Sequence, residues 1–235
     1  MPELPEVETV SLALSKVVTN AKILKTEIFR NDLRWNIKKS LKKDLHNDFF
    51  KKPFRRGKYI LVPTNKDNIL LIHLGMSGQI KIRDNFETLL KHDHVRIKIK
   101  SNKDKIYFIT YNDPRRFGYI DLFNNKEINQ HFLLKKLGVE PFEKELNVDY
   151  LELIFKKKMK CIKDTLMDQS VIAGIGNIYA SEILFSAKIN PSRSVKTLKR
   201  EEIKSIIKAT RQILQKSINV GGTTLQNHLQ PNGKL

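Results

Sequence analysis

The first twenty residues carry apolar side chains at the spacing of an amphipathic helix. These positions are Val7, Val10, Leu14, Val17 and Val18, and they recur with a period of about 3.6 residues. Pro5 suits the first turn of a helix, and Glu6 complements the positive end of its dipole. The pattern predicts a helix packed on a sheet, with Pro2 and Glu3 in an extended segment just ahead of it.

Residues 21–123 have the pattern of strands and turns. Segments 79–83 and 94–100 alternate polar and apolar residues, which is the period of a half-buried strand. Segment 69–74 is apolar except for His73, as in a buried strand. Turn-forming residues interrupt the pattern at 65–68, 101–103 and 112–114. Short strands with such breaks predict an antiparallel sandwich or barrel.

From about residue 127 the spacing becomes helical. Leu133, Leu134 and Leu137 predict a short helix ending at Gly138. Further helices are expected at 148–159, around 178–187 and at 198–218. The sequence therefore predicts an α+β protein with a β-rich domain at 1–125, a linker region with a short helix at 126–142 and a helical domain at 143–228. The groove between two domains is a natural ligand site.

Charge narrows the choice of partner. The 235 residues contain 44 Lys and Arg against 25 Asp and Glu, a net charge of +19. Such an excess implies a polyanionic partner. No apolar run approaches the length of about 20 residues that a membrane helix needs, and the acidic start does not resemble a signal peptide. Cys161 is the only cysteine, so no internal disulfide or thiolate zinc site is expected, and an intracellular, cytoplasmic setting fits. An inert thiol is the natural interpretation of Cys161.

The N-terminus offers a nucleophile. Pro2 is small enough to permit removal of Met1, which would expose a secondary amine. Such an amine can attack C1′ of a deoxyribose and form an iminium ion. Glu3 and Glu6 are close in sequence and could move protons at the sugar ring. Residue types leave ordinary helix capping open as the alternative.

Three internal turns combine basic, apolar and aromatic residues. Lys58, in Arg55-Arg56-Gly57-Lys58-Tyr59, could contact a phosphate or lie on a solvated turn. Met76 lies between two glycines and could be an apolar wedge between bases or part of the core. Arg115 and Phe117 follow Asn112-Asp113-Pro114, and could enter a base stack or form a surface turn with Phe117 buried.

Further segments could bind anions. His92 and His94 would share one face of a strand, but a third metal ligand is not evident, so phosphate contact or surface placement is favoured. Asn177 lies near the start of a helix after Gly174-Ile175-Gly176, where free backbone N–H groups could bind a DNA phosphate or the helix could simply be capped. Gly221 and Gly222 could cradle a base edge or only end the preceding helix.

Taken together these segments resemble the formamidopyrimidine-DNA glycosylase family. The resemblance runs through residues 1–9, 56–59, 73–78, 91–94, 113–118, 166–168, 174–182 and 221–225, which spans essentially the whole chain. Leu4-Pro5-Glu6-Val7 favours this branch over the related endonuclease VIII branch. The resemblance implies a β-sandwich with a packed N-terminal helix, followed by a helix–two-turns–helix domain.

The resemblance also implies roles for particular residues. Pro2 would form a Schiff base, Glu3 would donate a proton, and Lys58 would contact phosphate and assist β-elimination. Met76, Arg115 and Phe117 would fill the gap that the everted base leaves in the duplex. The residues that would contact the DNA backbone are His92, Arg115, Lys158 and Asn177. The residues that would recognise the lesion are Glu6, Ser217, Gly221, Gly222, Thr223 and Thr224.

The implied activity is a base-excision-repair glycosylase that removes oxidised purines and nicks the abasic site. Double-stranded DNA with oxidised purines or abasic sites is the expected partner of a monomer that needs no cofactor. The family normally continues into a zinc finger with four cysteines, which this sequence lacks, whether as a naturally shortened member, a truncated product or a degraded one. The alternatives are a weakly active or non-catalytic damaged-DNA binder of the same family and a general RNA binder. The RNA binder lacks support from any RNA-module motif.

Overall fold

The computed structural model describes residues 2–86 and 88–222. These residues form two compact units. The first contains Pro2 and Glu6–Asn129, and the second contains Glu3–Pro5 and Gln130–Gly222. Each unit has a hydrophobic core of its own.

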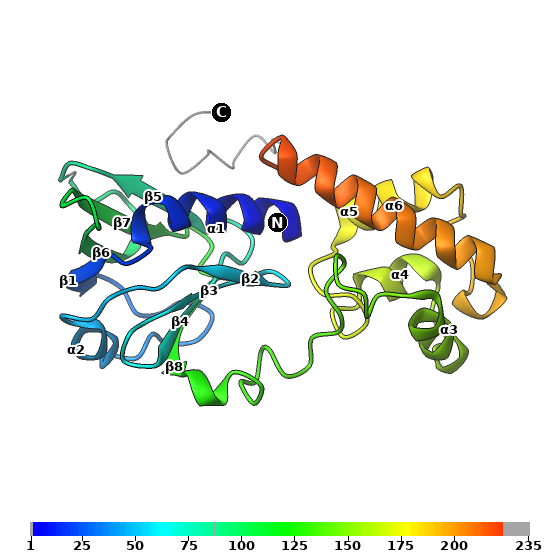
Figure 1. The fold of residues 1–235 in the computed structure, drawn as a ribbon, viewed down its shortest axis with the longest axis horizontal. Coiled ribbons are helices and arrows are strands. Elements are labelled where there is room, and N and C mark those ends of the chain that lie inside the picture. Colours follow the sequence, from blue (N-terminus) through cyan, green and yellow to red (C-terminus); the bar gives the residue numbers. More distant parts are fainter. Residues whose placement is uncertain (1, 87, 223–235) are drawn as a thin grey trace. The chain divides into compact units, whose positions relative to one another are not determined.

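The first unit is built from two antiparallel four-stranded sheets (Figure 1). One sheet has the order β1-β6-β7-β5, with bounds Lys22–Ile28, Asp93–Lys100, Ile106–Asn112 and Gln79–Arg83. The other has the order β2-β3-β4-β8, with bounds Phe54–Arg56, Tyr59–Pro63, Asn68–His73 and Tyr119–Asn124. The expected sandwich is confirmed.

Helix α1 (Leu4–Val18) contributes its apolar stripe to the core of this unit. Val7, Leu14 and Val18 are buried there, beside side chains from both sheets, such as Ile97 and Ile72. The helix predicted from the periodicity is confirmed. A short helix, α2 (Leu41–Leu45), was not predicted, because its single turn is too short to show a period.

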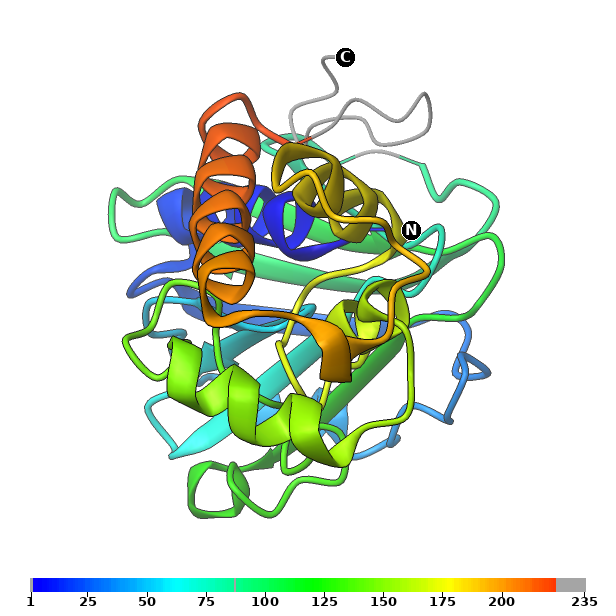
Figure 2. The ribbon, with the colours of Figure 1, turned by 90° about the vertical axis from the view of Figure 1, so that its right-hand side faces the viewer.

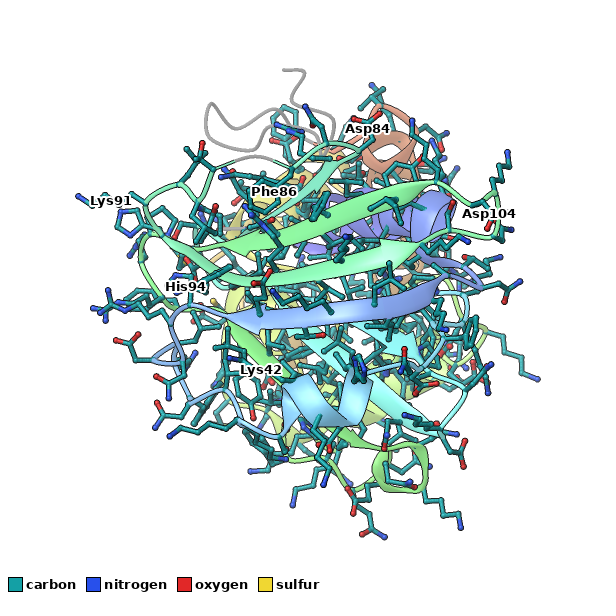
Figure 3. The ribbon with its side chains drawn as sticks, turned by 90° about the vertical axis from the view of Figure 1, so that its left-hand side faces the viewer. Lys42, Asp84, Phe86, Lys91, His94 and Asp104 are labelled. Atoms are coloured by element: carbon teal, nitrogen blue, oxygen red, sulfur yellow. The ribbon has the colours of Figure 1, made fainter. Side chains whose placement is uncertain are left out.

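Strand β6 differs from the half-buried strand that its alternation predicted. Arg96, on the outer face of the sheet, is only 4% exposed. Its Nε donates to Thr110 Oγ1 at 3.2 Å, and its guanidinium lies 5.3 Å from the Phe86 ring centre and 5.9 Å from that of Phe29. Figure 3 shows the segment carrying Phe86 against this sheet. The polar face is therefore covered, because aromatic rings can bury a guanidinium that keeps a hydrogen bond.

The second unit is helical (Figure 2). Its helices are α3 (Val148–Lys157), α4 (Ile162–Met167), α5 (Asn177–Ser186) and α6 (Arg200–Asn219). Short 3-10 turns occur at η1 (Asn125–Glu127), in the first unit, and at η2 (Val195–Thr197). The helices expected at 148–159, 178–187 and 198–218 are confirmed with shifts at their ends, and α4 was not predicted. No described helix is long and apolar enough to cross a membrane.

The short helix predicted to end at Gly138 is wrong. The backbone N–H groups of Leu134 and Lys135 both donate to the carbonyl of His131, and Leu137 donates to Leu134. These bonds make separate turns, without the continuous ladder of an α-helix. Gly138 N instead donates to the Gln169 carbonyl at 2.8 Å. Apolar spacing over six residues cannot distinguish a helix from consecutive turns that bury the same side chains.

Candidate active site

The carboxylate of Glu3 lies at the N-terminus of helix α5. Its Oε2 accepts from the backbone N–H of Gly176 at 2.6 Å and of Tyr179 at 3.4 Å, and its Oε1 accepts from Ile178 N at 2.9 Å. Glu3 is 2% exposed. Unsatisfied N–H groups and the positive end of the dipole make this a natural place for an anion. The anion site expected for a DNA phosphate is thus already occupied by a side chain of the protein.

Gly176 leaves the space that Glu3 needs. A Cβ atom at this position would lie 2.4 Å from Glu3 Cδ and 2.6 Å from its Oε1. The φ of −129° is extended, so the backbone itself does not require glycine. The residue is small because the carboxylate approaches the helix end closely. This makes Gly176 a determinant of where Glu3 lies.

The loop before α5 is braced by Gln169, a residue that no sequence motif indicated. Gln169 Oε1 accepts from Gly174 N at 2.9 Å, and Nε2 donates to the carbonyl of Ile175 at 2.6 Å. Leu4 N donates to the Gly174 carbonyl at 3.0 Å. The backbone beside Glu3 is therefore anchored to the same loop that binds its carboxylate.

Lys58 lies in the two-residue turn between β2 and β3 and is 8% exposed. Gly57 precedes it with a φ of +56°, which glycine adopts without a steric cost. On the preceding strand, Arg55 Nε donates to Glu8 Oε2 of α1 at 2.7 Å, which ties the hairpin to the helix. The open, solvated turn considered for Lys58 is therefore wrong. Pro2 and Glu6 are also buried.

His73, at the end of β4, stands in a positively charged environment. Burial and, to a smaller extent, the charges of Lys58 and Arg34 together lower the pKa of its imidazole to about 4, against the opposing charge of Asp113. Cationic groups close enough to disfavour imidazolium would attract an anion placed among them. The only sequence signal for His73 is that it is the single polar residue in the apolar segment 69–74.

Met76, Arg115 and Phe117 come from two adjacent turns of the first unit. Gly75, with a φ of +60°, packs so closely that a Cβ would lie 2.4 Å from the Phe117 carbonyl carbon. Met76 is half-buried, whereas Arg115 and Phe117 are exposed. The Arg115 guanidinium lies 4.9 Å from the centre of the Phe117 ring. Phe117 is 47% exposed, so the alternative in which its ring is buried is wrong.

These exposed residues border a hollow of about 670 Å³. It is lined by Asp32, Leu33, Arg34, Arg115, Arg116 and Phe117. Arg116 pairs with Asp32, with 2.6 Å between Nη1 and Oδ2. A hollow bordered by an aromatic face and arginines can accept a flat ring and a phosphate.

His92 and His94 do not share a face. His94 is fully buried, and its Nε2 lies 2.8 Å from the carbonyl of Asp113. Because a carbonyl can only accept, Nε2 carries the proton. His92 is half-exposed, precedes β6 and has a φ of +72°. His94 is therefore structural. Among the described residues, no group of three or more His, Cys, Asp or Glu could hold a metal ion.

Two family models match most of the chain. The formamidopyrimidine-DNA glycosylase N-terminal domain matches residues 1–120, and the formamidopyrimidine-DNA glycosylase H2TH domain matches residues 137–228. The chain belongs to the formamidopyrimidine-DNA glycosylase family. The H2TH match confirms the expected helix–two-turns–helix region.

Relatives support this family over the whole chain. The formamidopyrimidine-DNA glycosylase of Bartonella quintana is 39% identical over 249 residues, which cover 100% of this chain and 86% of the relative. That of Zymomonas mobilis is 40% identical over 236 residues, covering 100% and 85%. The wild-type Lactococcus lactis Fpg (MutM), in complex with DNA containing N7-benzyl-Fapy-dG, superimposes with a TM-score of 0.89 at 33% identity. That match covers 99% of this chain and 85% of the solved one.

The remaining residues expected in a formamidopyrimidine-DNA glycosylase site lie in the helical unit. Asn177 is the exposed first residue of α5. Lys158 is the C-cap residue directly after α3, and its Nζ contacts Asp168 Oδ2 at 2.5 Å. Burial opposes ionisation of Asp168, but hydrogen bonds from Lys158 and Ser170 outweigh it and lower the pKa to about 2. Lys158 is therefore paired with a carboxylate in this structure.

Apart from Glu6 in α1, the residues expected to recognise the lesion lie in the last turns of α6 and directly after it. Ser217 is 7% exposed inside the last turns of that helix, with its Oγ 2.5 Å from the Tyr179 hydroxyl. Gly221 and Gly222 have φ values of +86° and +88°, and Gly222 N donates to the Ser217 carbonyl at 2.7 Å. The two glycines thus end the helix, as one alternative predicted. Thr223 and Thr224 lie outside the described residues.

Proposed function

We propose that the amine of Pro2 is the nucleophile of this DNA glycosylase. As a formamidopyrimidine-DNA glycosylase, the protein excises damaged bases from DNA and cleaves the abasic site. In the proposed reaction the Pro2 nitrogen bonds to C1′ and loses its proton while the bond from C1′ to the base breaks, and the leaving base takes a proton. The bond from C1′ to O4′ then breaks, O4′ takes a proton, and the opened sugar is left joined to Pro2 as an iminium ion. Loss of a proton from C2′ of the iminium ion then expels the 3′ phosphate, which is β-elimination.

The observation that carries this proposal is the fixed carboxylate next to Pro2 in the chain. Three backbone N–H groups, one from the N-cap Gly176 and two from the first turn of α5, bind the carboxylate of Glu3. A general acid or base works only when it is held within hydrogen-bond reach of the atom it serves. We infer that Glu3 transfers protons at the sugar, and that Lys58 contacts a phosphate beside the reacting nucleotide.

The substrate is inferred to be double-stranded DNA that contains an oxidised purine or an abasic site. The net charge of +19 supports a polyanionic substrate. The L. lactis protein was solved with N7-benzyl-Fapy-dG DNA and, non-covalently, with DNA containing an AP site. Arg115, Phe117 and Met76 would fill the gap left by the everted base. His92, Asn177 and Lys158 would contact the DNA backbone.

We propose that the protein acts as a monomer in the cytoplasm, at the bacterial nucleoid, without a bound cofactor. An amine and carboxylates supply the covalent and proton-transfer chemistry of the proposed reaction. The sequence has one cysteine, Cys161, which does not fit a zinc site of four thiolates.

Trapping with borohydride tests the assignment of Pro2. Borohydride reduces an iminium ion to a stable amine, so the protein with Met1 removed should become covalently attached to a duplex with an abasic site. The matched control carries an N-terminal tag that is not cleaved, and it should bind the same duplex without being trapped. Equal trapping by the tagged protein would show that another amine reacts. No trapping by either form would favour a damaged-DNA binder without catalysis.

A further inference from the structure

Asp113, directly after β7, has a fully buried carboxylate that joins two turns. Its Oδ1 accepts from the Ser77 hydroxyl at 2.6 Å, and its Oδ2 accepts from the backbone N–H of Gly118 at 2.8 Å. Ser77 belongs to the turn that carries Met76, whereas Gly118 ends the turn that carries Arg115 and Phe117. Each oxygen therefore binds one of the two turns.

The backbone of Asp113 is also fully engaged. Its N–H donates to the His92 carbonyl at 3.1 Å, and its carbonyl accepts from His94 Nε2 at 2.8 Å and from Arg116 N at 3.2 Å. A buried residue whose donor and acceptors all have partners cannot move without breaking several bonds together. The carboxylate is thus held in one position from the interior of the sheet.

Ser77 extends the connection to the exposed loop. Its Oγ donates to Asp113 and accepts from the backbone N–H of Arg115 at 3.1 Å. On the other side of the loop, Gly75 lies against the backbone of Phe117 and Gly118, with no room for a side chain. Polar bonds and close packing therefore hold the two turns together.

The hydroxyl of Tyr111 lies beside the Asp113 carboxylate and contacts the end of β4. It donates to the His73 carbonyl at 3.1 Å and lies 3.4 Å from Asp113 Oδ2. Burial and the nearby Asp113 charge raise the pKa of this hydroxyl, so it stays protonated and keeps donating. A Cβ on Gly118 would overlap this hydroxyl, so the turn rests directly on it.

We propose that Asp113 is a positioning residue that makes the Met76 turn and the Arg115–Phe117 turn act as one unit when they enter the gap left by an everted base. The inference rests on the proposed function, in which these three side chains fill that gap. Asp113 touches neither substrate nor reacting atoms and acts through Ser77, Gly118 and the backbone of Arg115. Side chains that are already ordered lose less entropy when they insert, so lesion binding is tighter.

The Asp113→Asn variant tests this directly. An amide carries no charge and its NH₂ group can only donate, so the charge-assisted bond from the Ser77 hydroxyl to Asp113 is lost and only a neutral bond with reversed direction can replace it. Ser77→Ala is the second variant, and it removes the bridge to Arg115 without placing a new group in the core. Asp48→Asn is the matched control, because Asp48 is 2% exposed and accepts from the backbone N–H of Phe49 and Lys66 away from these turns.

The readouts are affinity and a fluorescent base. Each protein is titrated with an undamaged duplex and with a duplex that contains a tetrahydrofuran abasic analogue opposite 2-aminopurine. Wild-type protein should prefer the tetrahydrofuran duplex and raise the 2-aminopurine emission as the base is unstacked. Asp113→Asn and Ser77→Ala should bind that duplex about tenfold more weakly, as expected for one lost charge-assisted hydrogen bond. They should produce a smaller emission change at saturation, with undamaged-duplex affinity unchanged.

The outcomes separate the positioning role from the proposed function. If wild-type protein prefers the tetrahydrofuran duplex and both variants match it in affinity and emission, the positioning role is wrong. If wild-type protein shows no preference and no trapping, the proposed function itself fails. A loss shared equally by Asp48→Asn would mean that general destabilisation explains the result, which also overturns the inference. Should Asp113→Asn fail to fold, Ser77→Ala decides alone.

Discussion

Replacing Gly176 by alanine should displace the carboxylate of Glu3 while Glu3 itself is left unchanged. The added methyl group would lie 2.4 Å from Glu3 Cδ and 2.8 Å from its Oε2. Alanine can adopt the local backbone, since φ is −129° and ψ is −160°. The carboxylate is the end of a flexible side chain, so it will move rather than the helix. The bonds from Gly176 N and Ile178 N, at 2.6 and 2.9 Å, will then be lost or lengthened.

The expected size follows from what those bonds do. General acid–base catalysis typically contributes about 10²–10⁴-fold in rate, so excision of 8-oxoguanine should slow by at least about 100-fold. Stability should change far less. One charge-assisted hydrogen bond contributes about 2 kcal/mol, which for a protein of this length corresponds to a fall in Tm of about 4–8 °C. A large loss of rate with a small loss of stability is the signature of a misplaced carboxylate.

Single-turnover excision on a duplex with 8-oxoguanine gives the rate, and thermal unfolding gives Tm. Glu3→Gln provides the reference for loss of the carboxylate. In a Glu3→Ala background the methyl group of Gly176→Ala meets no carboxylate, so adding it should change neither rate nor Tm. The reasoning is refuted if Gly176→Ala excises at the wild-type rate, or if the same drop in Tm persists in the Glu3→Ala background.

Three further outcomes follow from the charges. His73 is neutral when folded but has an ordinary pKa near 6.5 when unfolded, so the unfolded state binds the extra proton between pH 6.5 and about 4. The free energy of unfolding should therefore fall as the pH is lowered from 6.5 to about 4, by at most about 1.4 kcal/mol per pH unit. Denaturant unfolding of His73→Gln should lack that slope. The depressed pKa of Asp168 stabilises the fold above pH 4, and this contribution should be lost as the pH falls through about 2. Asp168→Asn should therefore show a shallower acid transition. An acid transition unchanged by this substitution would contradict the pairing with Lys158. Duplex affinity should fall steeply as the salt concentration rises, with a slope of about −0.9 per phosphate contact in a plot of log affinity against log salt concentration. A flat salt response would argue against a basic binding surface. Asn177→Ala should weaken binding to all sequences alike.

The sequence was sufficient to predict a helix or strand wherever the pattern of apolar residues within that one element shows which side chains are buried. The apolar stripe of α1 and the long amphipathic helix α6 follow from periodicity, because a helix places every third or fourth side chain on one face. Strand β4 follows from its continuous apolar run, which is typical of a strand buried on both faces. The N-terminal motif likewise identified Pro2 and Glu3 as candidates, since its residue types carry their own chemistry.

Tertiary structure decided the partners. Glu3 binds amides more than 170 residues away in the chain, and no local pattern encodes that contact. Arg96 is buried because Phe29 and Phe86 cover it, although alternation placed it in solvent. The links from Asp113 to Ser77 and Gly118 likewise depend on how two turns pack. Periodicity describes which face of an element is apolar, whereas the burial and hydrogen bonding of a polar group depend on what distant segments bring against it.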